Sequence, residues 1–237
     1  PTVLKTSDLI GILRGVRDHF RLPADCEITI EAHPSTVTIE GLSALVKAGF
    51  TRISFGAESM DNAELAGVGR AAFVGDTVMA VRQAREAGFA DINLDLMYGL
   101  PGQSPASWKS TLERCLDLTP SHLSCYALTV EPGRALAMDI EAGRCSPPDE
   151  GLQVAMEQAA DATLQAGGYE RYEISNYARP GCACRHNLLY WTHGEYVGLG
   201  PSAQSFLNGA RFGKTANLNA YQSDLAARRL PLSDYAR

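Results

Sequence analysis

Three carboxylates and one arginine carry the strongest chemical signal in the sequence. Glu31, Glu58 and Asp95 each end a short apolar stretch, and Arg70 lies on a glycine-containing loop. Any one of these acids alone is most simply a helix N-cap or a solvated loop residue. Burying three charges together is costly unless a partner compensates them. Two classes of partner fit: a metal ion with oxygen ligands, or a molecule that bears an ammonium, a sulfonium and a ribose.

An Ala-Gly-aromatic phrase defines the elements that position these groups. It occurs at Ala48-Gly49-Phe50, at Ala87-Gly88-Phe89 and at Ala166-Gly167-Gly168-Tyr169. A glycine here suits the left-handed conformation that ends a helix, and a strand follows it. The pattern predicts helices near 7–19, 38–48, 73–87, 105–117 and 149–166, and strands near 27–32, 52–57, 91–97, 122–130 and 170–175.

Helices that alternate with strands indicate an α/β fold with parallel strands and right-handed crossovers. The strands resemble near-continuous apolar runs, which is typical of a sheet covered on both faces. We therefore expect a barrel or a doubly wound sheet over residues 1–175. The alternation of helices and strands is lost over residues 176–237, where we expect a loop-rich region. In α/β barrels the active site lies at the carboxyl ends of the strands, where the three acids fall.

Composition excludes several classes of protein. The 237 residues carry a net charge of −6 with scattered basic residues, so no nucleic-acid partner is expected. No apolar run is long enough for a transmembrane segment. The six cysteines follow neither a disulfide nor a zinc pattern, and we expect a reducing, cytoplasmic location. Both ends of the sequence resemble cuts within a longer protein, so we expect a fragment.

Two motifs in the first half of the chain resemble one known family. Residues 94–103 read L-D-L-M-Y-G-L-P-G-Q, and residues 27–34 read E-I-T-I-E-A-H-P. Both resemble the radical S-adenosylmethionine (SAM) proteins of the oxygen-independent coproporphyrinogen III oxidase and HemW haem-chaperone family. Pro1-Thr2 is similar to the end of that family's G-G-T-P-T strand.

The resemblance implies a partial radical SAM (β/α) barrel in which Glu31, Glu58, Arg70 and Asp95 contact SAM. The family usually has Gln at position 58, and Glu loses an amide donor and adds a charge there. His33, where the family often has Asn or Asp, is interpreted as structural. The family's C-x-x-x-C-x-x-C ligands for a [4Fe–4S] cluster are expected upstream of Pro1. We therefore expect this chain alone not to cleave SAM.

The C-terminal part is similar to the HemW haem-chaperone branch. Residues 172–181 read Y-E-I-S-N-Y-A-R-P-G, residues 184–191 read C-R-H-N-L-L-Y-W, and residues 195–201 continue the likeness. The resemblance implies that His186 contacts haem, with a haem-receiving protein as partner. An imidazole can ligate haem iron, although a packed structural histidine is the simpler alternative from the residues alone. His193 is a competing ligand.

Three functions stay open at this point. The first is a HemW-type protein that binds haem and SAM. The second is oxidative decarboxylation of coproporphyrinogen III, and whether the chain is an enzyme is left undecided. The third is a metal-dependent barrel enzyme with Glu31, Glu58 and Asp95 as ligands.

Overall fold

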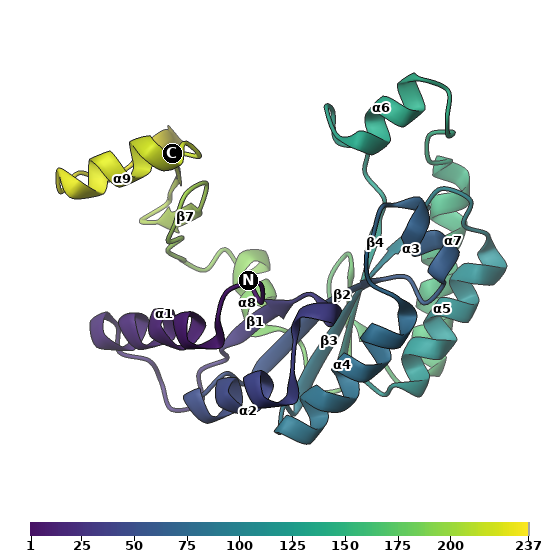
Figure 1. Ribbon diagram of the computed structural model, residues 1–237, viewed down its shortest axis with the longest axis horizontal. Helices are drawn as coiled ribbons and strands as arrows, with labels where there is room; N and C mark the ends of the chain where they lie inside the picture. Colours follow the sequence, from purple (N-terminus) through teal and green to yellow (C-terminus); the bar gives the residue numbers. More distant parts are fainter. Residues whose placement is uncertain (237) are drawn as a thin grey trace. The chain divides into compact units, whose positions relative to one another are not determined.

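The computed structural model describes residues 1–236, in two compact units that divide after Ala183 (Figure 1). The helices of the first unit are α1 (Thr6–His19), η1 (Pro34–Thr36), α2 (Ile39–Ala48), α3 (Asn62–Gly67), α4 (Val74–Ala87), α5 (Pro105–Asp117), α6 (Ala135–Glu141) and α7 (Glu150–Ala166). Its strands are β1 (Thr29–Ala32), β2 (Arg52–Glu58), β3 (Asp91–Tyr98), β4 (His122–Ala127), β5 (Glu170–Arg171) and β6 (Asn176–Ala178). The five predicted helices are confirmed, each within one residue of its predicted start, whereas the short α3 and α6 were missed.

The strands of the first unit form one sheet in the order β1-β2-β3-β4-β6-β5. Strands β1 to β4 are parallel neighbours, which confirms the predicted parallel arrangement. Strand β6 pairs antiparallel with β4, and β5 pairs antiparallel with β6. The fold is therefore α/β with a mostly parallel sheet that does not close into a full barrel.

The strand predicted over 170–175 exists but is shorter than predicted, and it pairs antiparallel with β6 rather than in parallel with β4. Strand β5 ends at Arg171, and the backbone N–H of Tyr172 then donates to the carbonyl of Asn176 at 3.1 Å. The Arg171 side chain holds this turn by donating to the carbonyl of Ile174. Because the chain reverses here, β6 runs back along β4 in the opposite direction.

Three glycines were predicted to end helices in the left-handed conformation, and two of these predictions are confirmed. Gly49 and Gly88 end α2 and α4 with φ angles of 101° and 105°, in the left-handed region. At the third, Gly167 has φ −78° and Gly168 has φ 83°. The left-handed position after α7 therefore falls one residue later than predicted.

The two faces of the sheet differ in chemistry. One face presents fully buried apolar residues such as Ile53, Phe55, Leu94 and Leu123, and packs against α2, α4, α5 and α7 (Figure 1). The opposite face presents polar residues at paired positions, namely Glu31, Arg52, Ser54, Asn93, Asp95, His122, Ser124 and Asn176. The expectation of strands that are apolar on both faces is wrong, because apolar and polar residues alternate along each strand.

The second unit contains α8 (Arg185–Trp191), β7 (Gln204–Leu207), β8 (Ala210–Lys214), α9 (Leu218–Ala226) and β9 (Leu232–Ala236). The three strands form an antiparallel sheet in the order β7-β8-β9. Asn208 and Gly209 join β7 to β8 with φ angles of 50° and 73°, as a two-residue hairpin turn requires. The loop between α8 and β7 falls in the predicted loop-rich region.

The division after Ala183 lies beyond the predicted boundary after residue 175, because β6 still belongs to the first sheet. None of the helices among residues 1–236 is long and apolar enough to cross a membrane.

Candidate functional site

The carboxyl end of β2 carries a partly buried ion pair. The strand bulges between Gly56 and Glu58, and Glu58 takes a left-handed φ of 61°, which is uncommon outside glycine. The Glu58 carboxylate accepts a hydrogen bond from Arg70 and is largely buried. A Cβ at Gly56 would lie 3.4 Å from Glu58 Oε1 and 3.6 Å from Arg70 Nη2. The pair therefore covers Gly56 on the polar face of the sheet.

Asp95 stands beside this ion pair, because Gly56 and Asp95 are partners in the register of β2 and β3. Its Oδ2 accepts from Ser54 Oγ at 2.7 Å, and its Oδ1 accepts from Asn93 Nδ2 at 2.9 Å. A carboxylate has about four lone-pair sites. Asp95 is thus held from within the sheet and still has acceptor capacity for a ligand.

Glu31 completes the set on the neighbouring strand. It is exposed on β1 and is aligned with Ser54 of β2, whose hydroxyl binds Asp95. The fold therefore brings Glu31, Glu58, Arg70 and Asp95 to one face of three adjacent strands, close to their carboxyl ends. Their role as contacts to SAM stays a prediction.

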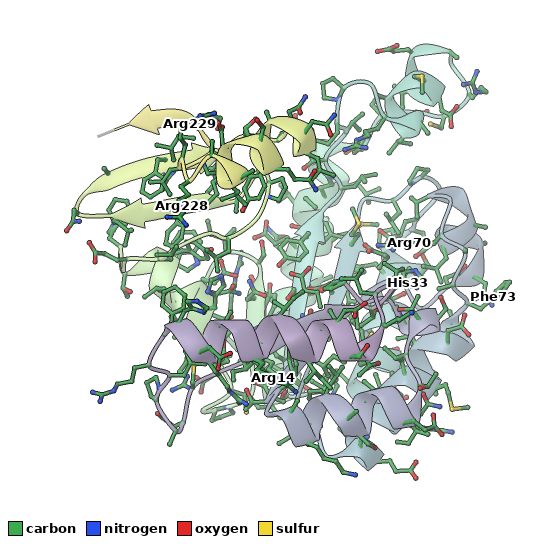
Figure 2. The ribbon with its side chains drawn as sticks, turned by 60° about the vertical axis from the view of Figure 1, so that its left-hand side comes forward. Arg14, His33, Arg70, Phe73, Arg228 and Arg229 are labelled. Carbon is green, nitrogen blue, oxygen red and sulfur yellow. The ribbon has the colours of Figure 1, made fainter. Side chains whose placement is uncertain are left out.

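His33 follows β1 and caps η1. Its Nδ1 accepts from the backbone N–H of Ser35, and its own backbone N–H donates to Thr2 Oγ1 at 3.1 Å. His33 and Arg70 are both labelled in Figure 2. Burial and then the charge of Arg70 lower the pKa of His33. The capping bond confirms the structural interpretation of this histidine.

The turn after β3 is closed by one side chain of the signature motif. Gly99 and Gly102 have φ angles of 77° and 75°, a left-handed conformation that glycine adopts without strain. Gln103 Oε1 accepts from the backbone N–H of Gly99 at 2.7 Å, and its Nε2 donates to Glu64 Oε2 at 3.0 Å. Glu64 Oε2 also accepts from Ser59 at 2.5 Å. Gln103 therefore ties the loop after β3 to the loop after β2.

Asn93 and His122 form a polar cluster that the sequence analysis missed. Both are buried on the polar face, and His122 Nδ1 lies 2.6 Å from Asn93 Oδ1. His122 Nε2 lies 2.8 Å from Tyr172 Oη. Burial and then the charge of Arg52 lower the pKa of His122 to about 3, so the ring is neutral near neutral pH. The signal was present in the sequence, since polar residues alternate with apolar ones through both strands.

The predicted haem contact lies in the second unit. His186 is exposed in α8, and its ring packs edge-on against Tyr190 with centroids 4.8 Å apart. Tyr190 packs in turn against Tyr196 at 4.5 Å, and Trp191 is 51% exposed. His193 lies just beyond the helix with a left-handed φ of 54°. An imidazole beside exposed aromatic rings can offer an iron ligand and an apolar surface.

No metal cluster is found among the side chains of residues 1–233, since no three His, Cys, Asp or Glu are suitably grouped there. The alternative of a metal ion on Glu31, Glu58 and Asp95 therefore has no ligand cluster in this part of the chain. The six cysteines are free thiols. Burial raises the pKa of Cys115 to about 12 and raises that of Cys125 as well, which is typical of packing residues.

Comparison with known proteins places this geometry in context. The family model "Radical SAM superfamily" matches residues 3–115. "Heme chaperone HemW" of Mycobacterium tuberculosis is 36% identical over 99% of this chain and 60% of the relative. The protein of the same description from Escherichia coli is 38% identical over 86% of this chain and 53% of the relative.

Among solved structures, the chain is similar to "Coproporphyrinogen III oxidase (HemN) from Escherichia coli". The TM-score is 0.85 with 25% identity, over 100% of this chain and 57% of that chain. The chain thus spans between half and two thirds of the length of these relatives.

Proposed function

The chain belongs to the radical SAM superfamily, in the family of HemW haem chaperones and HemN-like proteins, and we propose that it is part of a HemW-type protein that binds SAM and haem. The observation that carries this proposal is the similarity to a curated haem chaperone over 99% of the chain. The part of the chain that is similar to this relative includes both the polar face of the sheet and His186.

The polar face supports the SAM half of the proposal. Glu31 and Asp95 would act as acceptors for the ammonium and hydroxyl groups of SAM. Arg70 would hold the Glu58 carboxylate in place, as it does in the partly buried ion pair. The donor set fits the ligand, because Asp95 keeps open acceptor positions and Glu31 is exposed. When bound, SAM supplies a sulfonium whose carbon–sulfur bond a reduced [4Fe–4S] cluster can break.

The cluster itself does not fit the cysteines described here. Cys115, Cys125 and Cys184 are buried, and no three cysteine, histidine or acidic side chains group together among residues 1–233. The described part of the chain therefore offers no set of residues that would hold the cluster.

The second unit supports the haem half. His186 would ligate the iron, while Tyr190 and Trp191 would cover part of the macrocycle with apolar surface. Haem would then pass to a receiving protein, and both this partner and a cytoplasmic location stay predictions. The alternative, oxidative decarboxylation of coproporphyrinogen III, is favoured only by the similarity in fold to HemN.

Haem titration tests the proposal. We expect the full-length protein to bind haem with a visible Soret shift, and His186→Ala to weaken binding at least about tenfold. His193→Ala is the matched control, an exposed histidine nearby, and it should bind haem as wild type does. Equal affinity of His186→Ala and wild type would exclude His186 as the ligand. Turnover of coproporphyrinogen III by the cluster-reconstituted protein would instead identify the decarboxylase.

A further inference from the structure

The directions of the hydrogen bonds in the polar cluster can be assigned from chemistry alone. Asp95 can only accept, so the Asn93 amide nitrogen must face it, at 2.9 Å. The same nitrogen donates to Ser54 Oγ at 2.7 Å, and Ser54 donates to the second oxygen of Asp95 at 2.7 Å. Both hydrogens of the Asn93 amide are thereby used, and its oxygen must point away from Asp95.

That orientation fixes the tautomer of His122. The Asn93 oxygen accepts, so His122 Nδ1 must carry the proton that it donates across 2.6 Å. Nε2 is then unprotonated and accepts from Tyr172 Oη at 2.8 Å. The result is one directed chain of hydrogen bonds from Tyr172 through His122 and Asn93 to Asp95.

The end of this hydrogen-bonded series that lies farthest from Asp95 is Tyr172, and it is held in place independently of any ligand. Tyr172 lies in the turn between β5 and β6, directly after Arg171. Arg171 forms ion pairs with Glu157 at 2.5 Å and Asp161 at 3.0 Å on α7, and it donates to the backbone of the turn. The Tyr172 ring also packs edge-on against His122 with centroids 5.5 Å apart. The turn therefore has little freedom to release His122.

We infer that Asn93, His122 and Tyr172 are positioning residues that set the orientation of Asp95 toward SAM. None of the three would touch SAM; they act through the Asp95 carboxylate, whose two oxygens they and Ser54 hold. This inference rests on the proposed SAM site and extends it from the carboxylate to the turn after β5.

The test measures the dissociation constant of SAM for the full-length, cluster-reconstituted protein. His122→Leu removes the donor to Asn93 and should raise this constant about 3- to 10-fold. His122→Asn retains an amide donor at the position of Nδ1 and should stay within about twofold of wild type. Tyr172→Phe removes the outermost link, the hydrogen bond to His122, and should have a smaller effect than His122→Leu.

Two controls separate positioning from general damage. Tyr169→Phe removes a buried tyrosine hydroxyl from the residue just before β5, one that donates to the carbonyl of Pro120, and should leave SAM affinity unchanged. The double variant His122→Leu/Asp95→Asn should bind SAM no more weakly than Asp95→Asn alone, because His122 acts on SAM only through Asp95.

Nitrogen NMR of labelled histidine gives a readout independent of SAM. The His122 signals should report a protonated Nδ1 and an unprotonated Nε2, and Tyr172→Phe should shift the Nε2 signal. A His122 ring protonated on Nε2 instead of Nδ1 would overturn the inference. So would a double variant in which His122→Leu and Asp95→Asn each raise the dissociation constant of SAM independently. If wild type binds SAM and His122→Leu binds it equally well, only the inference fails. If wild type does not bind SAM, the proposed SAM site fails as well.

Discussion

The two faces of the six-stranded sheet share one backbone and differ in what holds them together. On the apolar face, Phe55 and Leu94 are fully buried against helices, so their contribution comes from surface removed from water and from close packing. On the polar face, Asn93 and His122 are equally buried, yet each is held by hydrogen bonds of defined direction.

Because of this difference, the two faces should respond differently to mutation. A side chain on the apolar face can be exchanged for another of similar volume at small cost. On the polar face each group depends on a specific partner, because an unpaired buried polar atom is costly. Adjacent residues such as Leu94 and Asp95 should therefore respond to mutation in opposite ways.

The largest effect on stability is expected on the apolar face. Leu94→Ala should lower the free energy of unfolding by about 3–5 kcal/mol, since Leu94 is 0% exposed and a cavity would remain. Urea denaturation measures this loss. At temperatures where the variant is folded, its affinity for SAM should match wild type; a loss of affinity as large as that of Asp95→Asn would show that the two faces are not independent.

The sequence predicted the apolar half of this comparison well. The five main helices follow from periodicity and from glycine stops, because Gly49 and Gly88 are needed at left-handed positions. The parallel order of β1 to β4 follows from the alternation of helices and strands. The left-handed residue after α7 was predicted at Gly167 and is Gly168, because either of two consecutive glycines can adopt that conformation.

The polar half was only partly predicted. Glu31, Glu58 and Asp95 were identified from their places at strand ends, and they do share one face. Asn93 and His122 were missed because their strands were interpreted as apolar runs rather than as alternating ones. The contact between His122 and Tyr172 depends on the turn after β5, and no local pattern predicts such a long-range pairing.

The second prediction concerns pH and the polar face. Burial lowers the pKa of His122 from 6.5 to about 3, so the unfolded chain binds a proton that the folded chain refuses. Stability should therefore fall as pH drops from about 6.5 toward 3, by up to about 1.4 kcal/mol per pH unit from this group. His122→Asn cannot titrate, and its free energy of unfolding should depend less steeply on pH.

The comparison between wild type and His122→Asn isolates this one group. The raised pKa of Asp91, caused mainly by burial, acts in the opposite direction, and the lowered pKa of His33 acts in the same direction as that of His122. Both are present in the two proteins and cancel in the difference. Parallel curves of unfolding free energy against pH would contradict a buried neutral His122.

The third prediction concerns the partly buried ion pair of Glu58 and Arg70. Arg70→Met should destabilise the protein by about 1–3 kcal/mol, because it leaves the Glu58 carboxylate buried without its partner while Arg70 itself is 35% exposed. The double variant Glu58→Gln/Arg70→Met removes the orphaned charge and should recover about 1 kcal/mol or more of that loss. Denaturant unfolding of the two single variants and the double variant measures the coupling. A double variant less stable than Arg70→Met would show that the cost lies in lost packing.

The smallest effect on stability is expected at Glu31, which gives the sharpest contrast with Leu94. Glu31 is exposed on β1, so Glu31→Gln should change the free energy of unfolding by no more than about 0.5 kcal/mol. The proposed SAM site nevertheless requires its charge, so the dissociation constant of SAM should rise severalfold. Glu40→Gln, which neutralises an exposed acid at the start of α2 on the other side of the sheet, is the matched control for binding and should leave the dissociation constant of SAM unchanged. If Glu31→Gln and Glu40→Gln bind SAM equally well, Glu31 lies outside the site, and the functional surface begins at β2 rather than at β1.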